Sequence, residues 1–169
     1  MTMQGSGAAE SAGRVFTTER EFAAPREVVF RAFSSAEHLK QWWGPKGWTL
    51  PVCEVDFRPG GVWFYGMRGP NGEESWGKAT YREIAPPERI VYTDAFADAE
   101  GNINPDMPQM EITITFTDLG GSTRVTSRAI FPSAESLDTA VGTGMVEGMN
   151  ETFDRLEAFL TGAEDPQRG

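Results

Sequence analysis

The sequence is poor in the side chains from which disulfides and metal sites are built. Cys53 is the only cysteine and His38 the only histidine in 169 residues. An intrachain disulfide is therefore impossible, and a metal site of two or three histidines is excluded. We expect Cys53 to pack as a small hydrophobe, the compartment to be a reducing cytoplasm, and the protein to carry no metal or other cofactor.

Basic side chains are also scarce. Fifteen Lys and Arg stand against 25 Asp and Glu, giving a formal net charge of -10. This charge repels phosphate backbones and anionic lipid head groups, so neither nucleic acid nor a membrane is an expected partner. No apolar run approaches the roughly 20 residues of a transmembrane helix. Residues 1–13 lack the pattern of a signal peptide. We expect disordered tails over 1–13 and 162–169 around a single domain over 14–161.

Motifs that would indicate catalysis or a bound ion are incomplete. The stretch DAEGNINPD, residues 98–106, spaces its oxygen side chains like a calcium loop, but Ile103 and Gln109 replace the required Gly and Glu. The stretch GTGMVEG, residues 142–148, imitates a dinucleotide fingerprint without the preceding strand. No serine has an evident base. With no recognisable catalytic constellation, binding is favoured over catalysis.

The first third of the chain predicts a strand followed by two short helices. Residues 14–22 have the pattern of a strand, and Pro25 suits the first turn of a helix. Ser34 and Glu37 have capping-box spacing, which predicts a second short helix that ends near Trp43.

Short β-rich runs between turn residues predict six antiparallel strands over 48–131. In MEITITF, residues 110–116, alternate side chains are apolar, so one face of the sheet is buried. Val62 and Phe64 place apolar groups on the opposite face, where a second subunit could cover them. Ser133 caps a long final helix with an apolar stripe that must lie across the sheet. Its glycines weaken the front half.

Large aromatic and methionine side chains are unusually dense on the expected inner surfaces. Such side chains can hold two layers apart, and methionine adapts its shape to different guests. We therefore predict a ligand cavity between the sheet and the final helix, with Tyr65 and Tyr92 as polar groups in its wall. The predicted wall consists of Trp42, Trp43, Trp63, Tyr65, Met67, Trp76, Tyr92, Met110, Met145, Met149 and Phe153.

The stretch QWWGPKGW, residues 41–48, raises the question of what its tryptophans cover. We expect Trp43 to lock the short helices onto the sheet and Trp42 to lie at the rim of the cavity. Pro45 and the two glycines predict a fixed turn, with the entrance beside it.

The motifs themselves resemble a known family. AAPREVVFRAFSSAEHLKQWWGPKGW, VDFRPGGVWFYGMRGPNG, YREIAPPERIVYTDAF and the closing FDRLEAFL are similar to the START-like (SRPBCC) superfamily, in the branch related to the activator of the ninety-kilodalton heat-shock chaperone's ATPase. The resemblance implies an α+β helix-grip fold of the START/Bet v 1 type: a curved antiparallel sheet around a long C-terminal helix, with two short helices at one end.

The resemblance fixes architecture more firmly than function, because members bind lipids, polyketides, hormones or other apolar molecules and some are enzymes. Many relatives carry Gly-Trp where this chain has Gly148 and Met149, which implies a roomier cavity. In the eukaryotic activator a further domain precedes this one, so we do not expect chaperone activation to carry over.

Three functions follow as hypotheses. The first is a protein that holds an apolar or aromatic small molecule in the cavity. The second is a cyclase or hydrolase that uses the same cavity, for which Asp94 or Glu111 would supply a buried carboxyl group. The third is a protein-interaction module, either a chaperone cofactor or a homodimer through Val62 and Phe64.

Overall fold

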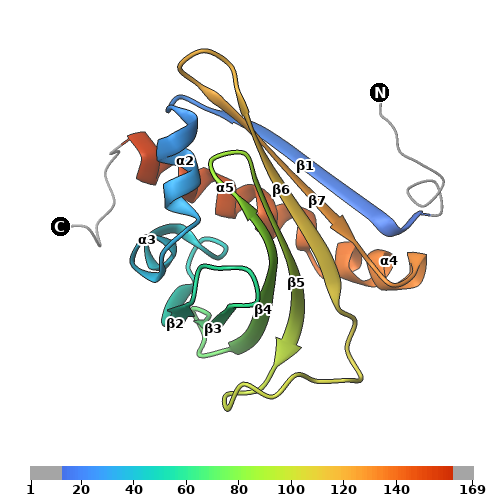
Figure 1. The fold of residues 1–169 in the computed structure, drawn as a ribbon. Coiled ribbons are helices and arrows are strands. Elements are labelled where there is room, and N and C mark those ends of the chain that lie inside the picture. The colour runs from blue at the N-terminus through green and yellow to red at the C-terminus, as the bar shows by residue number, and fades with distance from the viewer. Residues whose placement is uncertain (1–12, 162–169) are drawn as a thin grey trace.

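Seven antiparallel strands form one curved sheet in the computed structural model, which describes residues 13–161 (Figure 1). The sheet order is β1-β7-β6-β5-β4-β3-β2. Consecutive strands from β2 to β7 are neighbours, whereas β1 pairs with the distant β7. The strands are β1 (Val15–Phe22), β2 (Thr49–Val55), β3 (Val62–Arg68), β4 (Glu74–Ala85), β5 (Arg89–Ala97), β6 (Met110–Asp118) and β7 (Thr123–Ile130).

Within residues 13–161, four α-helices accompany the sheet. They are α2 (Arg26–Ala32), α3 (Ala36–Trp42), α4 (Ala134–Gly142) and α5 (Met145–Thr161). In Figure 1, α5 lies across one face of the sheet, and α2 and α3 lie at one end. The predicted α+β helix-grip fold and the six strands after the short helices are confirmed. Apart from Gly13, the tails expected over 1–13 and 162–169 lie outside the described residues.

The cap of the second short helix is one residue later than predicted. Ser35, not Ser34, accepts a hydrogen bond from the His38 backbone N–H at 3.2 Å. The Ser34 hydroxyl instead donates to the carbonyl of Arg31 at 2.8 Å, at the end of α2. Two adjacent serines thus serve two different helix ends, which the capping-box spacing alone could not separate.

The expected long final helix is divided into α4 and α5. Ser133 caps α4 as predicted, because its hydroxyl accepts from the Ser136 backbone N–H. Gly144 then has a φ of 98°, a conformation that side-chain-bearing residues rarely adopt, and this ends the helical path. The front piece has no fully buried residue, and Val141 of the predicted stripe is 44% exposed. Only α5 packs a buried stripe against the sheet, formed by Thr152, Phe153 and Leu156.

The apolar strip on the outer face is partly covered by the chain itself. Phe64 stacks on Trp76, with ring centroids 5.6 Å apart and an interplanar angle of 22°. The β5–β6 loop passes over this pair: the Lys78 ammonium donates to the carbonyl of Gly101 at 3.1 Å, and Gly101 borders the Phe64 ring. The Phe64 part of this strip is therefore covered without a second subunit.

Candidate ligand-binding site

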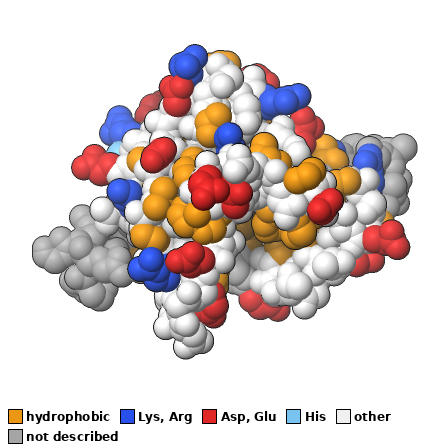
Figure 2. Space-filling view, turned by 90° about the horizontal axis from the view of Figure 1, so that it is seen from below, with side chains coloured by type: hydrophobic (Ala, Val, Ile, Leu, Met, Phe, Trp, Pro, Cys, Tyr) orange, Lys and Arg blue, Asp and Glu red, His pale blue; other side chains and the backbone are white. Residues whose placement is uncertain are grey.

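Three neighbouring cavities share wall residues: two lie between the sheet and the C-terminal helices, and the middle one is lined by residues of β3 to β6 alone. The outer cleft, about 470 Å³, lies under α4. The middle cavity, about 100 Å³, shares Phe96 and Met110 with the outer cleft, and the inner cavity, about 120 Å³, shares Asp94 with the middle one. Figure 2 shows hydrophobic side chains gathered around a hollow on the lower face of the molecule.

Apolar side chains dominate the walls of these cavities. The outer cleft is lined by Phe96, Met107, Pro108, Met110, Phe131, Ser133, Glu135, Ser136, Thr139, Ala140 and Thr143. The inner cavity is lined by Phe33, Trp43, Tyr92, Asp94, Ile112, Ile114, Val125, Ser127, Met149 and Phe153. Such a wall, with few polar groups, is typical of a small-molecule site.

The polar centre of the site is a tyrosine that crosses one strand to reach a carboxyl group. Tyr65 on β3 pairs with Gly77 on β4, and the tyrosine ring lies so close that a Cβ on Gly77 would be 2.3 Å from it. Because this glycine has no side chain, the Tyr65 hydroxyl can extend to Asp94 on β5. It donates to the two carboxyl oxygens, at 3.0 and 3.2 Å.

Burial changes the ionisation of this pair. Removal from water raises the pKa of Asp94 from 3.8 to about 7, against the opposing effect of hydrogen bonds from Tyr65 and from the Ala95 backbone N–H. Burial and the nearby Asp94 charge raise the pKa values of Tyr65 and Tyr92 well above 10. Near neutral pH, Asp94 therefore exchanges between the carboxylate and the carboxylic acid, while both tyrosines keep their protons.

Comparison with known proteins identifies the family of this fold. The family described as Activator of Hsp90 ATPase homolog 1-like protein matches residues 23–161. The chain belongs to this family. Its sheet, its C-terminal helix and the cavity between them are the helix-grip arrangement that the sequence motifs predicted. No curated protein matches the chain.

Solved structures agree with this assignment. A crystal structure of a protein from Mycobacterium smegmatis is 32% identical, with a TM-score of 0.83 over 90% of this chain and 94% of that one. A solution structure of a protein from Staphylococcus epidermidis is 33% identical, with a TM-score of 0.77 over 90% and 92% of the two chains. A solution structure from Arthrobacter aurescens is 28% identical, with a TM-score of 0.83 over 95% and 92%.

Most of the predicted wall borders the cavities in this member of the Activator of Hsp90 ATPase homolog 1-like family. Eight of the eleven predicted residues do so: Trp43, Tyr65, Met67, Trp76, Tyr92, Met110, Met149 and Phe153. Trp42, Trp63 and Met145 do not border these three cavities. Trp76 does so only at the margin, because its ring stacks on Phe64 on the outer face.

Of the two adjacent tryptophans, Trp43 rather than Trp42 borders a cavity. Trp42 is fully buried, and its indole N–H donates to the carbonyl of Ala32 at 3.0 Å, so it locks α3 to α2. Trp43 follows the end of α3, is only partly buried and borders the inner cavity. The expected packing of Trp43 onto the sheet agrees with its contact with Trp63 on β3, with ring centroids 4.8 Å apart. The expected place of Trp42 at the cavity rim was wrong, because the last helical turn ends one residue earlier than expected.

Some of the site could not be assigned from sequence. The α4 residues of the outer cleft, such as Thr139 and Ala140, are small and carry no pattern that marks a cavity. Ile112 and Ile114 were recognisable as inward-facing from strand alternation. Of the two carboxyl groups considered, Asp94 faces the cavities, whereas Glu111 is exposed on the outer face.

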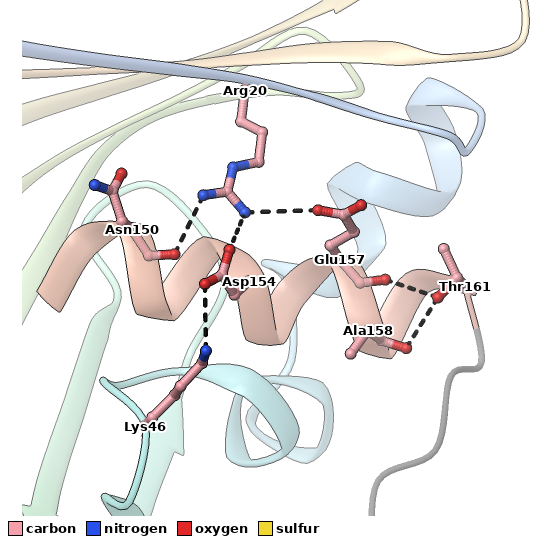
Figure 3. Close-up of polar contacts among 7 residues, drawn as sticks. All are labelled: Arg20, Lys46, Asn150, Asp154, Glu157, Ala158 and Thr161. Atoms are coloured by element: carbon pink, nitrogen blue, oxygen red, sulfur yellow. Dashed lines mark hydrogen bonds and ion pairs between the residues drawn. The ribbon is translucent and has the colours of Figure 1, made fainter. Parts of the chain in front are cut away.

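The turn beside Trp43 is held firmly by α5. Arg155 donates to the carbonyl oxygens of Gln41, Trp43, Gly44, Pro45 and Trp48 at 3.0 to 3.4 Å. A carboxyl oxygen of Asp154 lies 3.5 Å from the Lys46 ammonium, and another lies 2.6 Å from the Arg20 guanidinium on β1 (Figure 3). These ion pairs connect α5 both to the turn that contains Lys46 and to β1. The predicted fixed turn agrees with these contacts, but the large outer cleft lies under α4 rather than beside this turn.

Two further features of the described residues concern metals and membranes. Within 13–161, no group of three or more His, Cys, Asp or Glu side chains is arranged to hold a metal ion. None of the helices in the same range is long and apolar enough to cross a membrane.

Proposed function

We propose that this protein binds an apolar or aromatic small molecule in the outer, middle and inner cavities. The observation that supports this most is that the three cavities have overlapping apolar walls: Phe96 and Met110 border both the outer cleft and the middle cavity, and Asp94, hydrogen-bonded to Tyr65, borders both the middle and the inner cavity. An apolar guest would lose its contact with water there, and each Å² of apolar surface removed from water contributes roughly 25 cal/mol. We also propose a cytoplasmic location, as expected from the single cysteine.

A fluorescence titration with N-phenyl-1-naphthylamine, an uncharged apolar dye, tests the proposal. Saturable binding and a raised melting temperature are expected. Ala140 borders the outer cleft, so Ala140→Phe should fill the cleft and weaken binding at least about tenfold. Val141 is its exposed neighbour on α4 and borders none of the three cavities, so Val141→Phe is the matched control. Absence of saturable binding, or equal weakening by both variants, would contradict the proposal.

A second candidate function is proton-transfer catalysis in the same cavities. It is favoured by the position of Asp94 in the walls of the middle and inner cavities, where burial raises its pKa to about 7, in the range that suits a general acid or base at neutral pH. A reaction of this kind should follow a pH profile that changes near 7 and should be lost in Asp94→Asn. If esters and ketones bind but none is converted, the catalytic function is wrong and only the binding function stands.

An interaction module receives less support. The outer strip that could have served as a docking surface is partly covered by the β5–β6 loop, through Gly101 and Lys78. We therefore place small-molecule binding ahead of a homodimer or a chaperone cofactor.

A further inference from the structure

The charges in the cavity walls are all of one sign. Asp94 borders the middle and inner cavities, and Glu135 on α4 borders the outer cleft. No Lys, Arg or His is among the described residues that line the three cavities. An anionic ligand would meet two carboxyl groups and no compensating cation, which disfavours carboxylates, phosphates and sulfates.

Asp94 keeps unused capacity to accept hydrogen bonds. An ionised carboxyl group has about four acceptor positions. In the described structure this one receives the Tyr65 hydroxyl and the Ala95 backbone N–H. The side chain is only partly buried and borders two cavities, so its remaining positions can face a ligand.

The surroundings of Asp94 suit a cation with an apolar body. Trp43 and Tyr92 border the same inner cavity, and aromatic ring faces attract cations. The middle cavity beside Asp94 adjoins the outer cleft at Phe96 and Met110, which border both, and the outer cleft can hold a larger apolar group.

We infer that the ligand is an apolar or aromatic molecule with one protonated amine, which forms an ion pair with Asp94 while its apolar body occupies the outer cleft. This inference rests on the proposed function and specifies its ligand class. The titratable groups that face Asp94 are Tyr65 from β3 and Tyr92 from its own strand, with Glu135 from α4 farther along the cavities. Both tyrosines stay protonated at neutral pH, so Asp94 is the group whose charge changes there.

Three probes of matched size test the inference by isothermal titration calorimetry: 2-(2-naphthyl)ethylamine, 2-(2-naphthyl)ethanol and 2-naphthylacetic acid. The amine should bind about tenfold more tightly than the alcohol, and the acid most weakly. In wild type, amine binding should strengthen about tenfold or more from about pH 5.5 to pH 8, because Asp94 must lose its proton first. Alcohol binding should not depend on pH.

Two variants assign the preference to one residue. Asp94→Asn should bring amine affinity down to that of the alcohol and abolish its pH dependence, whereas Glu111→Gln, an exposed carboxyl on the outer face, should keep both. If the alcohol binds as tightly as the amine, or the acid binds best, the inference is wrong and the binding function stands. If none of the three probes binds, both are wrong.

Discussion

The guanidinium of Arg155 donates a hydrogen bond to the carbonyl oxygen of Trp43 at 3.3 Å, across 112 positions of sequence. The same side chain reaches four further carbonyl groups, that of Gln41 in the last turn of α3 and those of Gly44, Pro45 and Trp48 after it. A planar fork of donors thus replaces the water that these carbonyl groups would otherwise need, and it fixes the backbone of a residue that borders the inner cavity.

Replacing the Arg155 guanidinium by an ammonium group should destabilise the turn that follows α3. Arg155→Lys keeps the charge but cannot serve several carbonyl groups at once, so we expect a loss of about 2 kcal/mol in the free energy of unfolding, measured by urea denaturation. Arg58 is highly exposed and pairs only locally with Asp56, so Arg58→Lys should cost less than about 0.5 kcal/mol. Similar losses in both variants would mean that the carbonyl contacts of Arg155 contribute little.

The burial of Asp94 should make stability depend on pH. Its pKa of about 7 in the folded protein lies above the 3.8 of an unperturbed Asp, so the folded state binds more protons between these values. Stability contributed by this residue is therefore greatest below about pH 4 and falls as the pH rises through 7.

Removing the charge should reverse this loss. At pH 8, Asp94→Asn should be more stable than wild type by as much as about 4 kcal/mol, from 1.4 kcal/mol per pH unit, and near pH 4 the two should be equal. Urea denaturation at both pH values measures the difference. Glu111→Gln should show no such divergence, because Glu111 is exposed. A variant that is less stable than wild type at pH 8 would show that the carboxylate is well solvated or paired.

The Tyr65 hydroxyl should hold down the pKa of Asp94. Its hydrogen bond favours the ionised carboxyl group, so Tyr65→Phe should move this pKa above 7, as observed by a carbon-13 NMR titration of the carboxyl carbon. Tyr81→Phe provides the control. The Tyr81 hydroxyl is buried without a hydrogen-bond partner among the described residues, so its removal should leave the pKa of Asp94 unchanged and stability equal or higher. An unshifted pKa in Tyr65→Phe would contradict the proposed hydrogen bond.

Two glycines close together should respond in opposite directions to alanine. Gly144 has a φ of 98° at the junction of α4 and α5, so Gly144→Ala should lower stability by about 1 kcal/mol or more. Gly142 lies at the end of α4 with open space where a Cβ would stand, so Gly142→Ala should raise stability by up to about 1 kcal/mol. Thermal unfolding of both variants measures this. Equal effects would show that α4 and α5 can join into one helix.

Sequence reasoning recovered the sheet and the inner face well, because strand alternation and turn residues are local signals. Met110 and Ile112 could be placed on the cavity side from MEITITF alone, and the structure puts both there. The family motifs added the connection between the sheet and the C-terminal helix.

The predictions failed where a shift of one residue in a helix end or strand register reverses the direction of a side chain. Trp42 was expected at the cavity rim, where Trp43 lies instead, because the end of α3 could be placed only to within a residue. Trp76 was assigned to the inner face, yet its pairing with Gly66 turns it to the outer one. The link between Tyr65 and Asp94 was not predictable, because it depends on Gly77 of a third strand lying between them.

The pairing of β1 with β7 also constrains the order of folding. Val15 pairs with Ile130, whereas the strands from β2 to β7 are joined to their sequence neighbours. Contacts between residues so far apart form slowly, because a long loop must close before they are made. During synthesis the meander can form progressively, but the first strand must wait until residue 130 has emerged from the ribosome. After β7 has emerged and before β1 pairs with it, the edge of β7 is unpaired, and the nascent chain is most exposed to mispairing at that edge.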